Sequence, residues 1–269
     1  MRNRLCFLLF ASLLISSARA QTAASVVVRD PNAVALAARS LQAMAGITAL
    51  KDITLQANAT YIAGSDEEMG TATLIALGNQ QSLVTLSLTN GQRQEVRNGF
   101  TGAWSGVDQV PQLMAPHNCW SDANWFFPSL TLQALQADPT LGVLYLGPAT
   151  WNGRTVFHLQ FFHNVPGLSS SLLAQAQIVS AMDLLVDAQS LLPLSLSFNL
   201  HPDDDLNISI PVQVQFSGYR LLGGLLVPFH IQKYVQGTLA LDLQVSNAAV
   251  NSGVPQSEFV IPPTAGGLS

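Results

Sequence analysis

Apolar and polar side chains alternate one by one in five segments of the chain: 54–61, 84–89, 194–200, 207–216 and 239–246. Successive side chains of a strand point to opposite faces, so strict alternation indicates an antiparallel strand with one buried and one solvated face. The first segment shows the pattern clearly, since Leu55 and Ala57 are separated by the polar Gln56. The alternation predicts a fold made mainly of β-structure.

Residue pairs that favour tight turns lie between the alternating segments. Asn90-Gly91 and Asn152-Gly153 are typical of two-residue type I′ hairpin turns, because both residue types tolerate a positive φ. Gly223-Gly224 and Gln236-Gly237 are weaker forms of the same signal. Strands at this spacing predict a meander of about ten antiparallel strands. A sheet of that size must curl, pair face to face or be covered.

Helical signals are few. Asp30 is an N-cap residue, Pro31 suits the first helical turn and Gly46 is a C-cap residue, which predicts a helix over 31–45. Two further short helices are expected, over 129–137 and 168–179. Three helices are too few to build a domain of their own, but they are enough to cover the mouth of a curled sheet.

The predicted architecture is therefore mainly β, of α+β type. A large curled antiparallel sheet forms an unclosed barrel, and the N-terminal helix and the two short helices form its lid. We expect residues 21–263 to form a single domain and residues 264–269 to form a flexible C-terminal tail.

The first twenty residues have the features of a signal peptide. Arg2 and Arg4 precede the apolar run 5–15, and Ala18 and Ala20 provide the small residues of a cleavage site. The run is too short to cross a bilayer as a helix. We therefore expect cleavage after Ala20 and export to the periplasm or the medium, with no integral membrane span in the mature chain.

Composition excludes one class of partner. The chain carries 11 basic and 16 acidic side chains, and Lys51 and Lys233 are its two lysines. Electrostatic binding of nucleic acid needs clustered Lys and Arg, so no nucleic-acid partner is expected. The high apolar content of 48% indicates a folded chain, because disordered chains are poor in apolar residues.

Three sequence phrases resemble those of a known fold family. They are Arg97-Asn98-Gly99-Phe100 running on to Gly102-Ala103-Trp104, the turn Asp187-Ala188-Gln189 before Leu192-Pro193-Leu194, and Val227-Pro228-Phe229-His230-Ile231. Together with the order of elements over residues 30–261, they resemble the LolA/LolB-like fold of periplasmic lipoprotein carriers, as found in secreted bacterial relatives, many of them uncharacterised. The resemblance implies a hydrophobic cavity that accepts acyl chains. None of the phrases is a catalytic signature.

The segment 100–127 is the least regular part of the chain and is rich in aromatic side chains. Long irregular segments often serve as lids or binding loops, and aromatic and Met side chains suit an apolar ligand. The alternative is that these side chains only fill the core. The candidate ligand-binding residues are Trp104, Met114, Trp120, Trp125, Phe126 and Phe127.

The sequence predicts no metal site and no cofactor. His158 and His163 are five residues apart on an expected strand, so they point to opposite faces. The run 201–205 holds one histidine and three aspartates but lacks the ligand spacing of a calcium loop, and is interpreted as a solvated turn. The acidic run 66–68 is interpreted as a solvated hairpin tip.

The sequence gives little support for a catalytic role. Cys119 and His117 are close in sequence, but sequence neighbours rarely have the geometry of a nucleophile and its base, so a buried, inert Cys119 is favoured. Three hypotheses remain, in this order. The first is a carrier that binds an apolar small molecule, lipid or acyl chain. The second is a non-catalytic envelope protein with a packed barrel and a protein partner, and the third is a Cys119-dependent hydrolase.

Overall fold

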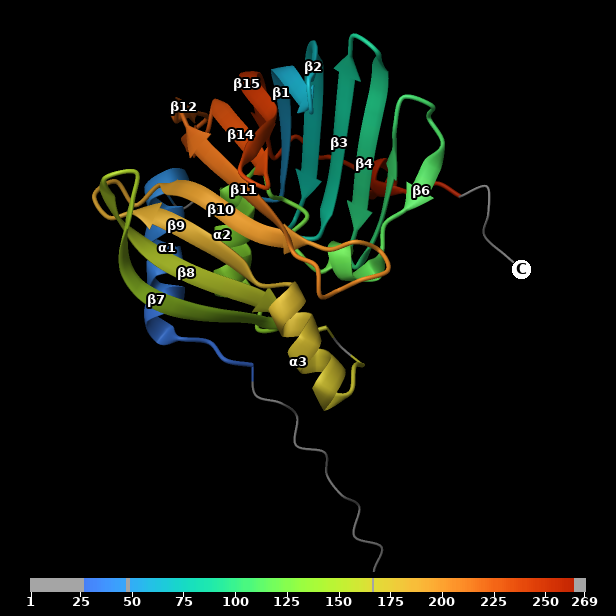
Figure 1. Cartoon of the computed structure of the whole chain (residues 1–269). Helices are drawn as coiled ribbons and strands as arrows, with labels where there is room; N and C mark the ends of the chain where they lie inside the picture. The colour runs from blue at the N-terminus through green and yellow to red at the C-terminus, as the bar shows by residue number, and fades with distance from the viewer. Residues whose placement is uncertain (1–26, 47–48, 166, 264–269) are drawn as a thin grey trace, which may run out of the picture.

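The computed structural model describes residues 27–46, 49–165 and 167–263 (Figure 1). The predicted signal peptide, residues 1–20, and the predicted tail, residues 264–269, lie outside the described residues. Among the described residues, no helix combines the length and the apolar character that a membrane crossing requires.

The three helices expected from the sequence are present. They are α1 (Pro31–Ala45), α2 (Pro128–Ala137) and α3 (Ser170–Val179), with short 3-10 helices η1 (Pro116–Cys119) and η2 (Gln256–Phe259). The Asp30 carboxylate caps the start of α1 by accepting a hydrogen bond from the Asn32 amide. The Gly46 amide caps its end by donating to a carbonyl of the last turn. Local capping chemistry therefore sets both ends of α1.

Within the described ranges, thirteen strands form one sheet and two more form a separate ribbon. The strands are β1 (Asp52–Ala63), β2 (Asp66–Leu77), β3 (Gln81–Leu88), β4 (Gly91–Asn98), β5 (Thr101–Ser105), β6 (Pro111–Leu113), β7 (Leu141–Trp151), β8 (Arg154–His163), β9 (Met182–Asp187), β10 (Pro193–Leu200), β11 (Ile210–Ser217), β12 (Arg220–Leu222), β13 (Leu225–Val227), β14 (His230–Val235) and β15 (Thr238–Val250). The predicted count of about ten is therefore too low, chiefly because short or irregular strands such as β6, β12 and β13 lack a clear alternation.

The order of strands in the sheet is β6-β5-β4-β3-β2-β1-β15-β14-β11-β10-β9-β8-β7. All neighbouring pairs are antiparallel. The outermost strands, β6 and β7, do not pair with each other, so the curled sheet stays open (Figure 1). The mainly β architecture with a large unclosed antiparallel sheet and three helices is confirmed.

Most of the predicted turns and faces are also correct. Asn152 and Gly153 both have positive φ, 47° and 76°, as a type I′ turn requires. The turn predicted at Asn90-Gly91 is wrong in position: Leu88 pairs with Gly91, so Thr89 and Asn90 form the loop and Gly91 already belongs to β4. The segment predicted from residue 207 is also too long, because β11 begins at Ile210.

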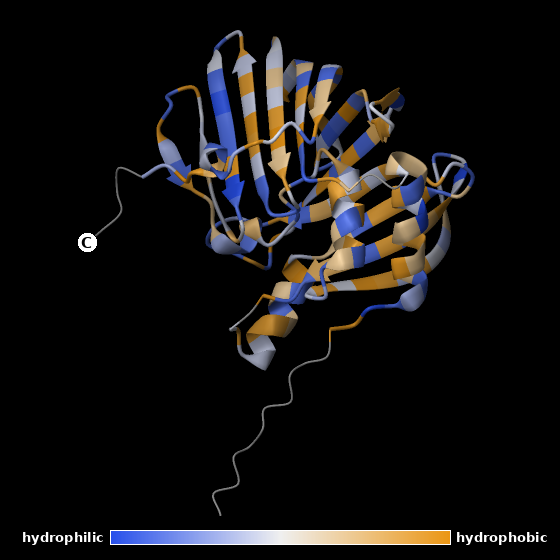
Figure 2. Cartoon of the chain, turned by 180° about the vertical axis from the view of Figure 1, so that it is seen from behind, coloured by the Kyte–Doolittle hydropathy of each residue, from blue (hydrophilic) through white to orange (hydrophobic). Residues whose placement is uncertain are grey.

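Two of the helices fill half of the hollow of the sheet. Figure 2 shows α1 and α2 against the half of the sheet formed by β7 to β11, and their packing is closest with each other, β7 and β13. Their buried faces join the main apolar core, which includes Leu36 and Leu132. Helix α3 lies beside β8 and buries Ala176 and Val179, whereas Ile178 is 76% exposed. The lid function assigned to the helices stays a prediction.

The C-terminal segment covers the outer face of the other half. Phe259 is fully buried against Val96 of β4 and Ala103 of β5, and Val254 and Ile261 pack around it. Since these strands have their opposite face on the inside of the hollow, the wall they form has apolar contacts on its outer side as well.

Gly70 of β2 provides a test of this packing. A Cβ atom at Gly70 would lie 2.0 Å from the backbone oxygen of Ser87 on β3, so the two strands would have to separate. We expect Gly70→Ala to lower the free energy of unfolding by about 2 kcal/mol, measured by urea denaturation. The control Gly106→Ala, whose nearest contact is 3.6 Å away, should change it by less than about 0.5 kcal/mol. Equal losses in both variants would contradict the close approach.

Candidate functional site

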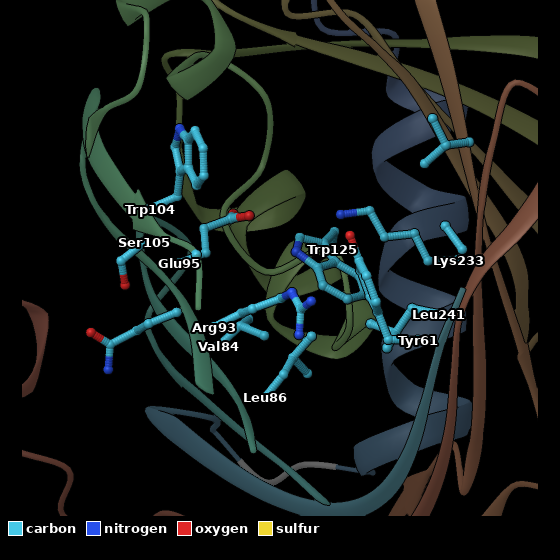
Figure 3. Close-up of a pocket in the computed structure, with 14 residues that line it drawn as sticks. Tyr61, Val84, Leu86, Arg93, Glu95, Trp104, Ser105, Trp125, Lys233 and Leu241 are labelled. Carbon is cyan, nitrogen blue, oxygen red and sulfur yellow. The ribbon is translucent and has the colours of Figure 1, made fainter. Parts of the chain in front are cut away.

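A cavity of about 380 Å³ opens on the concave side of the sheet, in the half that holds β3, β4 and β5 (Figure 3). Its walls also include β1, β14 and β15, and the loop before α2 contributes one tryptophan. The lining residues are Tyr61, Val84, Leu86, Arg93, Gln94, Glu95, Trp104, Ser105, Gly106, Trp125, Lys233, Val235, Ala240 and Leu241. The cavity is thus lined mainly by apolar side chains, with three charged ones among them.

Strand register explains why these side chains share one wall. Val84 of β3 pairs with Glu95 of β4, and Glu95 pairs with Trp104 of β5. Directly paired residues in antiparallel strands point to the same face, so the three side chains form a row across the concave surface. Leu86 and Arg93 form the next pair along the same face.

Trp125 lies at the centre of the cavity in Figure 3 and belongs to the loop that precedes α2. A buried carboxylate, Asp122, organises this loop: it accepts hydrogen bonds from the Asn124 amide and the Thr131 hydroxyl. Burial raises the pKa of Asp122, and these hydrogen bonds oppose the rise. Trp125 is only 3% exposed and meets Phe126 edge to face at 5.4 Å. The sequence offered no signal for Asp122, because its partners are set by the folded loop.

Only some of the six candidate ligand-binding residues line the cavity. Trp104 and Trp125 line the cavity. Phe126 and Phe127 are fully buried in the main core, as the core-filling alternative describes. The two remaining candidates, Met114 and Trp120, are partly buried and do not line this cavity.

Glu68 departs from its predicted role. Asp66 and Glu67 are exposed, as expected of a solvated hairpin tip, but Glu68 is 6% exposed and forms a two-bond ion pair with Arg93. The hydrogen bond from Arg93 lowers the pKa of the Glu68 carboxyl. The Arg93 guanidinium also lies over the Tyr61 ring, 4.7 Å from its centroid. Arg93 is therefore held in place and neutralised at the cavity wall.

Lys233 and Glu95 are the other two charged side chains of the cavity. The Lys233 ammonium lies 4.4 Å from the centroid of the Trp125 ring. Burial lowers the pKa of Lys233, and the negative charge of Glu95 opposes that decrease. Among the described residues, neither side chain has an ion-pair partner. Figure 3 shows both pointing into the cavity from opposite walls.

Known proteins resemble this chain in structure rather than in sequence. No family model matches the sequence, and no curated protein matches it. A domain from Vibrio parahaemolyticus, named as an outer membrane lipoprotein-sorting protein, superposes with a TM-score of 0.54 at 11% identity, covering 85% of this chain and 96% of its own.

Two further solved structures are similar. A LolA superfamily protein from Nitrosomonas europaea has a TM-score of 0.52 at 11% identity, covering 85% of this chain and 97% of its own. A DUF1329 family protein from Desulfovibrio piger has a TM-score of 0.53 at 12% identity, covering 87% and 98%. The chain has a LolA-like fold. The sequence resemblance is thereby confirmed at the level of the fold.

Cys119 lies outside the cavity of this LolA-like fold. Its side chain is 1% exposed, and burial raises the pKa of its thiol. A nucleophilic cysteine needs the opposite, an accessible thiol with a lowered pKa. The His117 ring bonds to the Pro202 carbonyl. The expected burial of Cys119 is confirmed.

The other histidines do not gather into a metal site within the described ranges. His158 bonds to Asp183 at 2.8 Å, whereas His163 is buried beside Phe100, where burial lowers its pKa to about 4. The loop that contains the run 201–205 exposes Asp203 and Asp204, as expected of a solvated turn. His201 departs from that description, because it is 7% exposed.

Thiol labelling tests the state of Cys119. In a Cys6→Ser chain, where Cys119 is the single thiol, we expect reaction with a disulfide reagent at neutral pH to be at least about tenfold slower in buffer than in denaturant. Burial and the raised pKa of the thiol both reduce the reactive thiolate in the folded protein. Equally fast labelling in both conditions would contradict this environment and would reopen the hydrolase hypothesis.

Proposed function

We propose that the protein is an exported, non-enzymatic carrier that binds an apolar ligand, an acyl chain or a similar molecule, in the cavity on the concave face of its sheet. The observation that carries the proposal is the cavity itself, whose walls are lined by side chains such as Val84, Leu86 and Leu241. Structural similarity to a domain named for lipoprotein sorting supports it, since that domain shares the fold.

Binding would be driven by removing apolar surface from water. Each buried CH₂ group of an acyl chain contributes about 0.8 kcal/mol, so a chain that lies along the apolar wall gains affinity with its length. Trp104 and Trp125 would contact it, because both line the cavity. Phe126 would support the wall from behind, because its ring meets Trp125 edge to face.

The cellular location of the protein is part of the same proposal. The features of residues 1–20 support cleavage near Ala20 and release into the periplasm or the medium. Residues 21–263 would then act as one domain, and no metal or cofactor takes part in reversible binding of this kind.

A second candidate is a non-catalytic envelope protein that binds another protein. The hairpin of β5 and β6 supports it, because Val107, Val110 and Leu113 there are 46–56% exposed and β6 is an edge strand. Exposed apolar side chains at a free sheet edge are typical of protein contact sites.

Filling the cavity tests the carrier proposal. Brominated monoacylglycerol, which has a neutral head, should quench the fluorescence of Trp104 and Trp125 when it binds. We expect Val84→Phe, which places a larger side chain inside the cavity, to weaken binding by at least about tenfold, because it removes space that the acyl chain needs.

The matched control is Val260→Phe. Val260 is 66% exposed and does not line the cavity, so this variant should bind like the wild type. Urea denaturation of both variants checks that each is folded. An absence of quenching in the wild type, or equal weakening by both substitutions, would overturn the proposal and leave the protein-binding candidate.

A further inference from the structure

The cavity contains a cation that lacks a close partner. Three charged side chains line it: Arg93, Glu95 and Lys233. Arg93 forms two bonds to the Glu68 carboxylate, with Nη1 3.0 Å from Oε2, and its charge is therefore neutralised. Lys233 has no hydrogen bond and no ion pair with any described residue, and rests on the face of Trp125. Of the two cations in the cavity, Lys233 is therefore the one whose charge a ligand can still neutralise.

The surroundings of Lys233 are largely apolar. Val235 on the same strand and Leu241 on the neighbouring strand lie beside it in the cavity wall, and Trp125 lies beneath its ammonium. A charged group that leaves water without a partner loses solvation free energy, and a stack on an aromatic ring returns only part of it. The lowered pKa of Lys233 is consistent with this loss. An anion placed beside the Lys233 ammonium would compensate for this loss through a direct charge interaction.

Glu95 limits what that anion can be. It faces Lys233 from the opposite wall (Figure 3), and it too has no ion pair within the described part of the chain. Its negative charge repels an anion in the same cavity, so a head group with one negative charge is tolerated better than one with several. Arg97, the remaining basic side chain nearby, donates to the Ser121 carbonyl and does not line the cavity.

We propose that the cavity selects an amphiphile with an acyl chain and a singly anionic head, and that Lys233 pairs with the anionic group while the chain lies along Val84 and Leu86. The inference rests on the proposed function and deepens it, because it adds the polar end of the ligand. Trp125 acts as the platform that holds the Lys233 ammonium at the head-group position.

Three palmitoyl amphiphiles with different heads separate the contribution of the head from that of the chain. Monopalmitoylglycerol is neutral, palmitate carries a carboxylate, and palmitoyl lysophosphatidylglycerol carries one phosphate charge. Below their micellar concentrations, we expect wild-type protein to bind both anionic compounds at least about tenfold more tightly than the neutral one, as a charge-assisted bond would give. The two anionic arms show whether a carboxylate or a phosphate is preferred.

Substitutions of the two facing charges should have opposite effects. Lys233→Met keeps the apolar stem over Trp125 and removes the charge, so it should weaken both anionic ligands by at least about tenfold and leave monopalmitoylglycerol within about twofold. Glu95→Gln removes the repulsion and should strengthen the anionic ligands several-fold. Lys51→Met, at an exposed lysine that does not line the cavity, is the matched control and should change nothing.

Each other pattern overturns the inference in a distinguishable way. If Lys233→Met weakens the neutral and the anionic ligands equally, Lys233 only shapes the cavity, and the inference is wrong while the carrier proposal stands. If the wild type binds all three compounds with equal affinity, the head group is not recognised, with the same consequence. If the wild type binds none of them, the carrier proposal itself fails and the inference fails with it.

Discussion

The pairing of β1 with β15 is the contact on which the rest of the structure depends. It joins the strands before α2 to those after it, with Ile53 opposite Val250 and Tyr61 opposite Leu241. Without this pairing the chain would form two smaller sheets, each with an uncovered apolar face. With it, thirteen strands share one curved surface whose concave side is deep enough to hold two helices and still leave a cavity. The bulge between Gln56 and Ala57 adds local twist at this junction.

The fold could be predicted from the sequence wherever local chemistry decides the structure. The caps of α1 and the alternation of β1 and β3 are local signals, and they gave correct elements. Strand β4 could not be found in this way, because its sequence, GQRQEVRN, is polar on both faces. It is a strand because β3 and β5 pair with it on either side, and because the C-terminal segment covers Val96. Tertiary pairing there overrides a weak local preference.

The candidate site could be predicted only in part, because some of its side chains come together only in the folded sheet. An aromatic segment points to an apolar site, and Trp104 and Trp125 do line the cavity. The charged members come from segments far apart in sequence, Glu68 and Arg93 on one side and Lys233 on the other. Glu68 shows the difficulty best: two of three adjacent acidic residues are solvated, and the third is buried because β4, which lies two strands away from β2 in the sheet, places Arg93 against it. Only the folded sheet brings these charged side chains together.

The contrast between the apolar lining of the cavity and its charged side chains favours a role for Lys233 and Glu95 in recognising a ligand. The LolA-like fold is shared with proteins at 11–12% identity, so very different sequences are compatible with it. Apolar lining is easily supplied by many residue types and selects poorly among acyl chains, since each CH₂ contributes the same increment. The half-buried Lys233 ammonium and the facing Glu95 carboxylate lose solvation free energy, and neither has an ion-pair partner among the described residues. Their presence at Lys233 and Glu95, in a protein with only two lysines, is the observation behind our proposal that the cavity recognises the polar end of a ligand.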